Sequence, residues 1–153
     1  MPTVNPLNSS ELVFPILECI HIIGLSLSVG TIALVDLRQL DIAMRHQTAA
    51  QLHNDTSMWT SIGLLVMIFS GLLLFSSDPD MYYLNWSFLI KMACLALAII
   101  FHYTIRRKTL ASPKSRPNAK VVALVSLALW AGVIFGGIFI GFVNDGLKLN
   151  WRL

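Results

Sequence analysis

The chain has 153 residues, of which 56% are hydrophobic and 12% are charged, and its formal net charge at pH 7 is +3. This composition is more apolar than that of an ordinary soluble domain and indicates a protein whose surface meets lipid. The positive charge does not indicate a nucleic-acid-binding protein, because the basic residues follow membrane topology and form no groove with interleaved aromatic residues.

Four hydrophobic segments are each long enough to cross a bilayer. A transmembrane helix needs about 20 apolar residues to cross a hydrocarbon core of about 30 Å. Short connections between the segments favour an up-and-down order. The sequence therefore predicts an all-α, integral-membrane bundle of four transmembrane helices that forms a single domain over residues 1–153. The predicted spans are residues 12–35, 58–76, 86–105 and 121–143.

The first span carries two ionisable side chains, Glu18 and His21, which are three residues apart. This spacing places them on one face of a helix, and Ser28 continues the same stripe. Ionisable side chains in hydrocarbon are costly unless they are paired or functional, so each one is a candidate site residue. No lysine or arginine precedes the span, so we expect it to be retained and not removed as a signal peptide.

The connection after the first span contains Arg38, Arg45, His46 and His53 among apolar residues at helical spacing. Such a pattern predicts a structured segment along the membrane surface. His46 is expected to be solvated, whereas His53 is a secondary candidate for metal ligation.

The third span carries Lys91 and His102, with Cys94 and Ala98 between them at helical intervals, so all four share one face. Glu18 and Lys91 lie five or six residues from the outer ends of their spans. At a rise of about 1.5 Å per residue they reach similar depths, and we expect a buried ion pair between them. The pair would either fix helix register or take part in ligation or proton handling.

The fourth span has no ionisable residue and contains overlapping pairs of glycines four residues apart, Gly132 with Gly136 and Gly137 with Gly141. This pattern predicts close helix contact. The contact would be made inside the bundle, beside a flat porphyrin, or between copies of the chain in a homo-oligomer.

Lysine and arginine are distributed unevenly over the two sides of the predicted membrane region. Eight of the eleven fall in the connections after spans one and three, and the other side has two, both in the C-terminal tail. By the positive-inside rule both connections are cytoplasmic and both termini are outside. The eight are Arg38, Arg45, Arg106, Arg107, Lys108, Lys114, Arg116 and Lys120.

The two histidines within the spans, His21 and His102, are candidate ligands of haem iron. Imidazole is a common axial ligand, and ligand sites of bundles are built from facing helices. Both histidines could bind one haem, although helical rise places them at depths that differ by roughly 10 Å, which also permits two haems at different depths. Lys91, His53 and Glu18 are then the secondary candidate ligands.

Arginine side chains near these histidines are candidate partners of the haem propionates, because guanidinium pairs well with carboxylate. They are Arg38, Arg106 and Arg107.

Four short motifs stand out: Glu18-x-x-His21, Asp36-Leu37-Arg38, Gly71, and Tyr83-x-Asn85-x-x-Phe88-x-x-Lys91. Together they resemble an uncharacterised family of small bacterial inner-membrane proteins with four helices, which is distantly similar to the membrane domains of copper-resistance protein D and cytochrome b561. For that wider group the resemblance implies b-type haem held by core histidines without covalent attachment, and electron transfer across or within the membrane.

The leading functional hypothesis is a membrane b-type cytochrome that carries electrons between a membrane donor, such as a quinol, and a redox partner protein. Copper or another metal ion is the alternative cofactor. Two other functions stay open: a non-enzymatic scaffold or assembly subunit, and a protein for metal or proton passage with mixed ligands on Glu18, Cys19 and His21. The sequence has no nucleophile elbow, phosphate-binding loop or zincin motif, so hydrolysis and group transfer are not expected.

Overall fold

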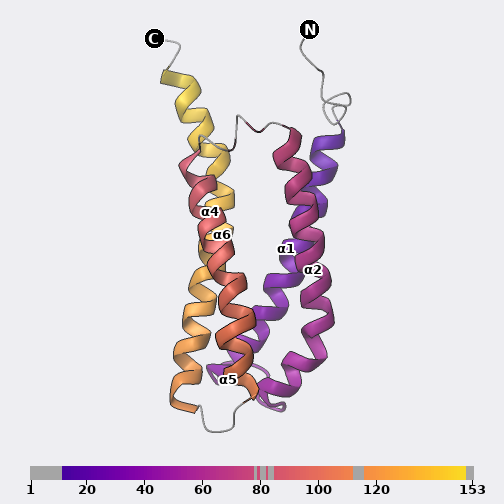
Figure 1. Cartoon of the computed structure of the whole chain (residues 1–153), viewed down its shortest axis with the longest axis vertical. Coiled ribbons are helices and arrows are strands. Elements are labelled where there is room, and N and C mark those ends of the chain that lie inside the picture. Colours follow the sequence, from indigo (N-terminus) through magenta and orange to yellow (C-terminus); the bar gives the residue numbers. More distant parts are fainter. Residues whose placement is uncertain (1–11, 78, 80–81, 83–84, 112–115, 151–153) are drawn as a thin grey trace. The chain divides into compact units, whose positions relative to one another are not determined.

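The structure is a computed structural model of the whole chain, and it describes residues 12–77, 79, 82, 85–111 and 116–150. Within these ranges the regular structure is entirely helical and contains no β-strand. The elements are α1 (Val13–Gln39), α2 (Ala49–Ser77), α4 (Trp86–Phe101), the π-helical turn η2 (His102–Arg106), α5 (Arg107–Ala111) and α6 (Arg116–Asn150), shown in Figure 1.

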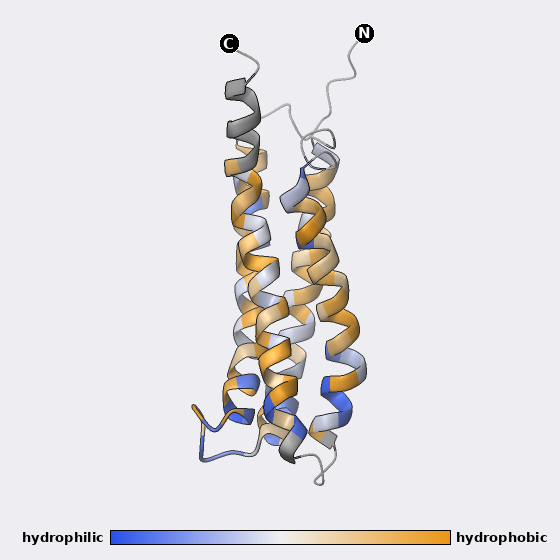
Figure 2. Ribbon diagram, turned by 90° about the vertical axis from the view of Figure 1, so that its left-hand side faces the viewer, coloured by the Kyte–Doolittle hydropathy of each residue, from blue (hydrophilic) through white to orange (hydrophobic). Residues whose placement is uncertain are grey.

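The described part of the chain holds four helical stretches that are long and apolar enough to cross a membrane. Many of their large hydrophobic side chains are exposed, as expected for helices that meet lipid, and Figure 2 shows the hydrophobic colour along each of them. This finding confirms the predicted all-α class and the four spans. The stretches are Val13–Gln39, Ala49–Ser77, Trp86–Leu110 and Asn118–Phe142.

Observed helices extend beyond the predicted spans on the side of the basic connections. The second helix begins at Ala49, nine residues before the predicted span, because Thr48 and Gln51 form a reciprocal cap. The Gln51 backbone N–H donates to the Thr48 hydroxyl oxygen at 3.2 Å, and the Thr48 N–H donates to Gln51 Oε1 at 3.0 Å. Such a capping box starts a helix regardless of hydropathy, so apolar content alone misses this first part of the helix.

The chain divides into two compact units, each described here by itself. Unit 1 comprises Met1–Ile32 and Asn54–Pro79, and unit 2 comprises Ala33–His53 and Asp80–Leu153. Long helices therefore contribute to both units, since α1 and α2 each contain a unit boundary. The predicted single domain stays a prediction.

In unit 1, the antiparallel helices α1 and α2 approach until their backbones touch. A Cβ atom added to Gly24 would lie 2.8 Å from the Met67 backbone nitrogen, and one added to Gly63 would lie 2.7 Å from that of Ser28. Only residues without a side chain permit such an approach, which is how small residues drive helix association in membranes.

In unit 2, α4 and α6 form a second antiparallel pair, held at one end by Asn85. The Asn85 side chain accepts from the Ser87 N–H at 2.9 Å, which caps α4, and donates to the Ile140 carbonyl oxygen at 3.1 Å. Further along the pair, a Cβ on Gly132 would lie 2.8 Å from Cys94 Sγ. The close contact predicted from the glycines of the fourth span is therefore made within this chain at Gly132.

A charged connection joins α1 to α2 at the α5 end of unit 2. Asp41 adopts a positive φ of 62° and accepts a hydrogen bond from Arg38 Nη1 at 2.9 Å. Lys120 Nζ, at the start of α6, lies 3.4 Å from the other Asp41 oxygen. The hydrogen bond from Arg38 and the ammonium of Lys120 hold the pKa of the Asp41 carboxyl below its usual value.

Candidate functional site

His21 lies in α1 and is hydrogen-bonded to α2 within unit 1. Its Nδ1 is 3.1 Å from Ser70 Oγ. The Ser70 hydroxyl donates its own hydrogen to backbone carbonyl oxygens, those of Val66 at 2.6 Å and Met67 at 3.2 Å. Ser70 is therefore the acceptor from His21, which places the proton of the neutral imidazole on Nδ1. The lone pair is then on Nε2, the arrangement of a metal-binding histidine whose other nitrogen donates to a neighbouring group.

A glycine gives the His21 ring its position. A Cβ atom on Gly71 would lie 3.1 Å from His21 Cε1 and 3.4 Å from Nδ1. The imidazole thus packs directly on the α2 backbone, and a side chain at this position would push it away. We call His21, Ser70 and Gly71 the His21 site.

A second polar cluster lies at the α5 end of unit 2 and contains a buried ion pair. Arg106 Nε donates to Asp36 Oδ1 at 2.8 Å, and the two side chains are 1% and 0% exposed. The buried Ser126 hydroxyl lies near the same carboxylate. Arg106 Nη1 lies 3.2 Å from His102 Nδ1. We call Asp36, His102, Arg106 and Ser126 the Arg106 cluster.

The π-helical turn η2 carries His102 and Arg106 at its two ends. The Arg107 N–H bonds to the His102 carbonyl oxygen five residues earlier, and the His102 N–H is shared between the carbonyl oxygens of Ala98 and Ile99. Single π turns inside α-helices are frequent at functional sites. Here the wider turn brings the guanidinium of Arg106 beside the imidazole of His102.

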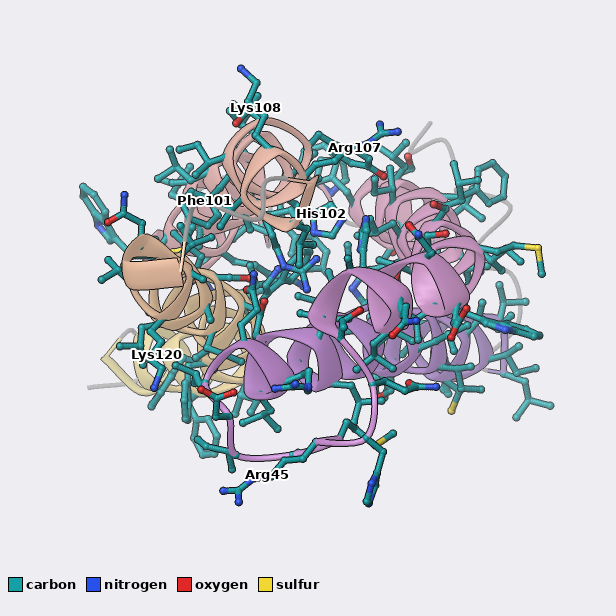
Figure 3. The ribbon with its side chains drawn as sticks, turned by 90° about the horizontal axis from the view of Figure 1, so that it is seen from below. Arg45, Phe101, His102, Arg107, Lys108 and Lys120 are labelled. Atoms are coloured by element: carbon teal, nitrogen blue, oxygen red, sulfur yellow. The ribbon has the colours of Figure 1, made fainter. Side chains whose placement is uncertain are left out.

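The tautomer of His102 is the opposite of that of His21. Arginine only donates hydrogen bonds, so His102 Nδ1 is the acceptor and the proton of the neutral ring is on Nε2. Figure 3 shows His102 directed inwards from its helix, whereas Lys108 extends outwards. The His102 side chain is only 6% exposed.

The structure brings together some of the predicted site residues. The ring centroids of His53 and His102, both in unit 2, are 6.0 Å apart, and Arg106 touches His102 directly. Glu18 is exposed in unit 1, whereas Lys91 is half-buried in unit 2. Pairing of Glu18 with Lys91, and a haem shared by His21 and His102, each join residues of different units and stay predictions.

The three arginines predicted to bind propionates differ in whether their guanidinium groups are already bonded to other residues. Arg106 is bonded to Asp36, and Arg38 to Asp41 and the Gln47 carbonyl oxygen. Arg107 is exposed and directed outwards (Figure 3).

Sequence reasoning missed three polar residues that organise these sites. Ser70 gave no signal, because serines that bond to their own helix backbone are ordinary in apolar helices. Asp36 follows the last residue of the predicted first span, where an acidic residue is expected to lie at the membrane surface, so its burial is not predicted. Gln39, one turn later, also lies just beyond the predicted span, so its burial is not predicted either.

The residues of the two sites fit a haem ligand role to different degrees. His21 has its lone pair on Nε2, the form that binds iron, and Ser70 orients the ring; Nε2 itself is buried. His102 would need to transfer its proton from Nε2 to Nδ1, and Arg106 would need to move, before it could bind iron through Nε2. Among the described residues, no three His, Cys, Asp or Glu side chains gather as a site for a metal ion.

Comparison with known proteins gives one relationship. Neither a curated protein nor a solved structure matches the chain. A family model described as Family of unknown function (DUF6644) matches residues 13–143, which is most of the chain and includes all four apolar helical stretches in whole or large part. The chain therefore belongs to this family.

Proposed function

We propose that this protein is a haem-b-binding electron-transfer protein of the bacterial inner membrane, with His21 as an axial ligand through Nε2. The observation that carries the proposal is the 3.1 Å contact of His21 Nδ1 with a serine hydroxyl whose own hydrogen is already donated to the backbone.

In this proposal each residue of the His21 site has a separate task. Nε2 of His21 binds the iron, Ser70 fixes the ring orientation and raises ligand basicity, and Gly71 leaves room for the ring. Bound haem supplies one-electron exchange. Lys91 and Glu18 stay the sequence-based candidates for the second axial ligand, and the exposed Arg107 stays the sequence-based candidate for a propionate.

The first experiment is the visible spectrum of the protein purified in mild detergent from haem-replete cells. We expect a red protein whose dithionite-reduced form gives a b-type α-band. His21→Ala should remove the band, His46→Ala should leave it unchanged, and Lys91→Met should alter it if lysine is the second ligand. A colourless preparation with a negative pyridine haemochrome assay would overturn the proposal.

The role of Ser70 is tested by titrating haemin into apo-protein. Removing a hydrogen-bond partner of a metal-ligating histidine lowers metal affinity about 10–100-fold, and we expect Ser70→Ala to weaken haem binding within this range. Ser61→Ala is the matched control, because Ser61 is an exposed α2 serine that donates to the Ser57 carbonyl oxygen at 2.9 Å and touches no histidine. Equal haem affinity in both variants would contradict the orienting role.

The second candidate function is a non-enzymatic scaffold or assembly subunit. The fully buried pair of Asp36 and Arg106 favours it, since buried charges are best attested as devices that fix the register of packed helices. This candidate predicts a colourless protein that co-purifies with a membrane partner, and that partner would be lost on mutation of the lipid-facing surface.

A further inference from the structure

We propose that the Arg106 cluster, together with Gln39, binds an uncharged aromatic alcohol of the hydroquinone class. The inference rests on the proposed function only where this ligand is read as the electron donor. The site lies in unit 2 and shares no residue with the His21 site.

His102 offers a hydrogen-bond donor to a ligand. Arg106 occupies Nδ1, so the proton is on Nε2. Among the described residues, no acceptor is bonded to Nε2, and Nε2 is not one of the fully buried polar atoms, although His102 as a whole is only 6% exposed. A ligand can therefore reach Nε2, and its oxygen atom would be a suitable hydrogen-bond partner.

Two buried acceptors on α1 require donors. Asp36 Oδ2 and Gln39 Oε1 have no hydrogen-bond partner among the described residues, and their side chains are 0% and 9% exposed. They lie three residues apart on α1, which places them on one helix face. A hydroxyl group satisfies both needs, because its oxygen accepts from His102 and its hydrogen is donated to Asp36 or Gln39.

The charges of the cluster favour a neutral ligand. Arg106 and Asp36 neutralise each other at 2.8 Å. An added cation would be repelled by Arg106, and an added anion would meet the two unpaired oxygens. The rings beside His102 favour an aromatic ligand, since Tyr103 lies 5.0 Å and His53 lies 6.0 Å from its ring centroid. Tyr103 is 48% exposed.

The tautomer is tested on haem-free, ¹⁵N-histidine-labelled full-length protein in lipid nanodiscs. Long-range ¹⁵N–¹H correlation should show His21 protonated at Nδ1 and His102 protonated at Nε2, with each signal assigned by its loss in His21→Gln or His102→Gln. A His102 signal protonated at Nδ1 would overturn the proposal before any ligand is added.

The ligand is tested by adding hydroquinone to the same sample. The His102 Nε2 signal should shift saturably, whereas the His21 and His46 signals should not move. 1,4-Dimethoxybenzene is the matched probe, because it has the same ring and oxygens but no hydrogen to donate, and it should bind roughly tenfold more weakly. Equal binding of both probes, or no shift with either, would mean that water fills the site and would overturn the proposal.

Variants separate hydrogen bonding from packing, with hydroquinone binding followed by saturation-transfer NMR. His102→Gln keeps an N–H donor and should retain binding within a few-fold. His102→Phe keeps a ring without a donor and should lose roughly tenfold, and the exposed His46→Gln is the control. The unchanged His21 signal verifies that each variant is folded. Because all samples lack haem, these outcomes are independent of whether His21 binds iron.

Discussion

The stability of unit 2 depends on Arg106. Its guanidinium is buried with Asp36 in a span, and it also fixes the tautomer of His102. A charge at this depth is tolerated only because its partner and hydrogen bonds replace water.

We expect Arg106→Gln to destabilise the protein by about 3–5 kcal/mol, because the Asp36 carboxylate would stay buried without its cation. Adding Asp36→Asn should recover part of this loss, which a double-mutant cycle of unfolding in detergent would measure. The matched control is Arg107→Gln at the next, exposed position, which should change stability by less than about 0.5 kcal/mol. Strictly additive losses from Arg106 and Asp36 would show that the pair contributes no coupling.

At the residue scale, the sequence indicates which ionisable side chains lie in the spans but not what they bond to. His21 and His102 stand out because imidazoles in apolar spans are rare and costly. Their opposite tautomers depend on Ser70 and Arg106, which come from other helices or from a π turn that hydropathy does not encode.

At the scale of elements, unit 1 depends on helices that touch without side chains between them. Gly24→Ala should destabilise by about 1–3 kcal/mol, because the added Cβ meets backbone atoms that have no rotamer in which to escape. Gly30→Ala on the same helix is the control, since nothing lies within 4 Å of its added Cβ. It should be neutral or stabilising by up to about 1 kcal/mol, through helix propensity. Thermal unfolding in detergent would compare them, and equal effects would contradict backbone contact at Gly24.

Helix existence was predictable from the sequence, and helix ends were predictable only where a cap is visible. Asn85 caps α4 one residue before the predicted span begins. Thr48 and Gln51 also match a cap, but they precede the apolar run, so hydropathy does not mark them as the start of the helix. The π turn left no signal, because it depends on the number of residues needed to bring Arg106 to Asp36.

At the scale of the whole molecule, composition predicts the membrane spans and the charge distribution predicts their orientation. The four apolar stretches follow from hydropathy alone, and the basic residues predict orientation. How Glu18 and Lys91 are related, in contrast, depends on tertiary placement that spacing along single helices does not supply.

The orientation is tested by cysteine labelling with an impermeant reagent in cells, after Cys19 and Cys94 are replaced by alanine. Asn118→Cys, at the start of the fourth span, should be protected because the positive-inside rule places it in the cytoplasm. Asn150→Cys should react from outside. Reversed labelling would overturn the orientation and move the Arg106 cluster to the outer leaflet.

The π turn also means that Arg107 would take the place of Arg106 if the turn lost one residue. In η2 one residue more than an α-helix needs separates His102 from Arg107. A shorter homologue lacking a residue such as Thr104 would continue as an ordinary α-helix, with the second arginine of the pair now four residues after the histidine. With two arginines in a row, a guanidinium lies opposite Asp36 both in the π turn and in an uninterrupted α-helix. We therefore expect the fold to tolerate a one-residue deletion here better than a substitution of Arg106.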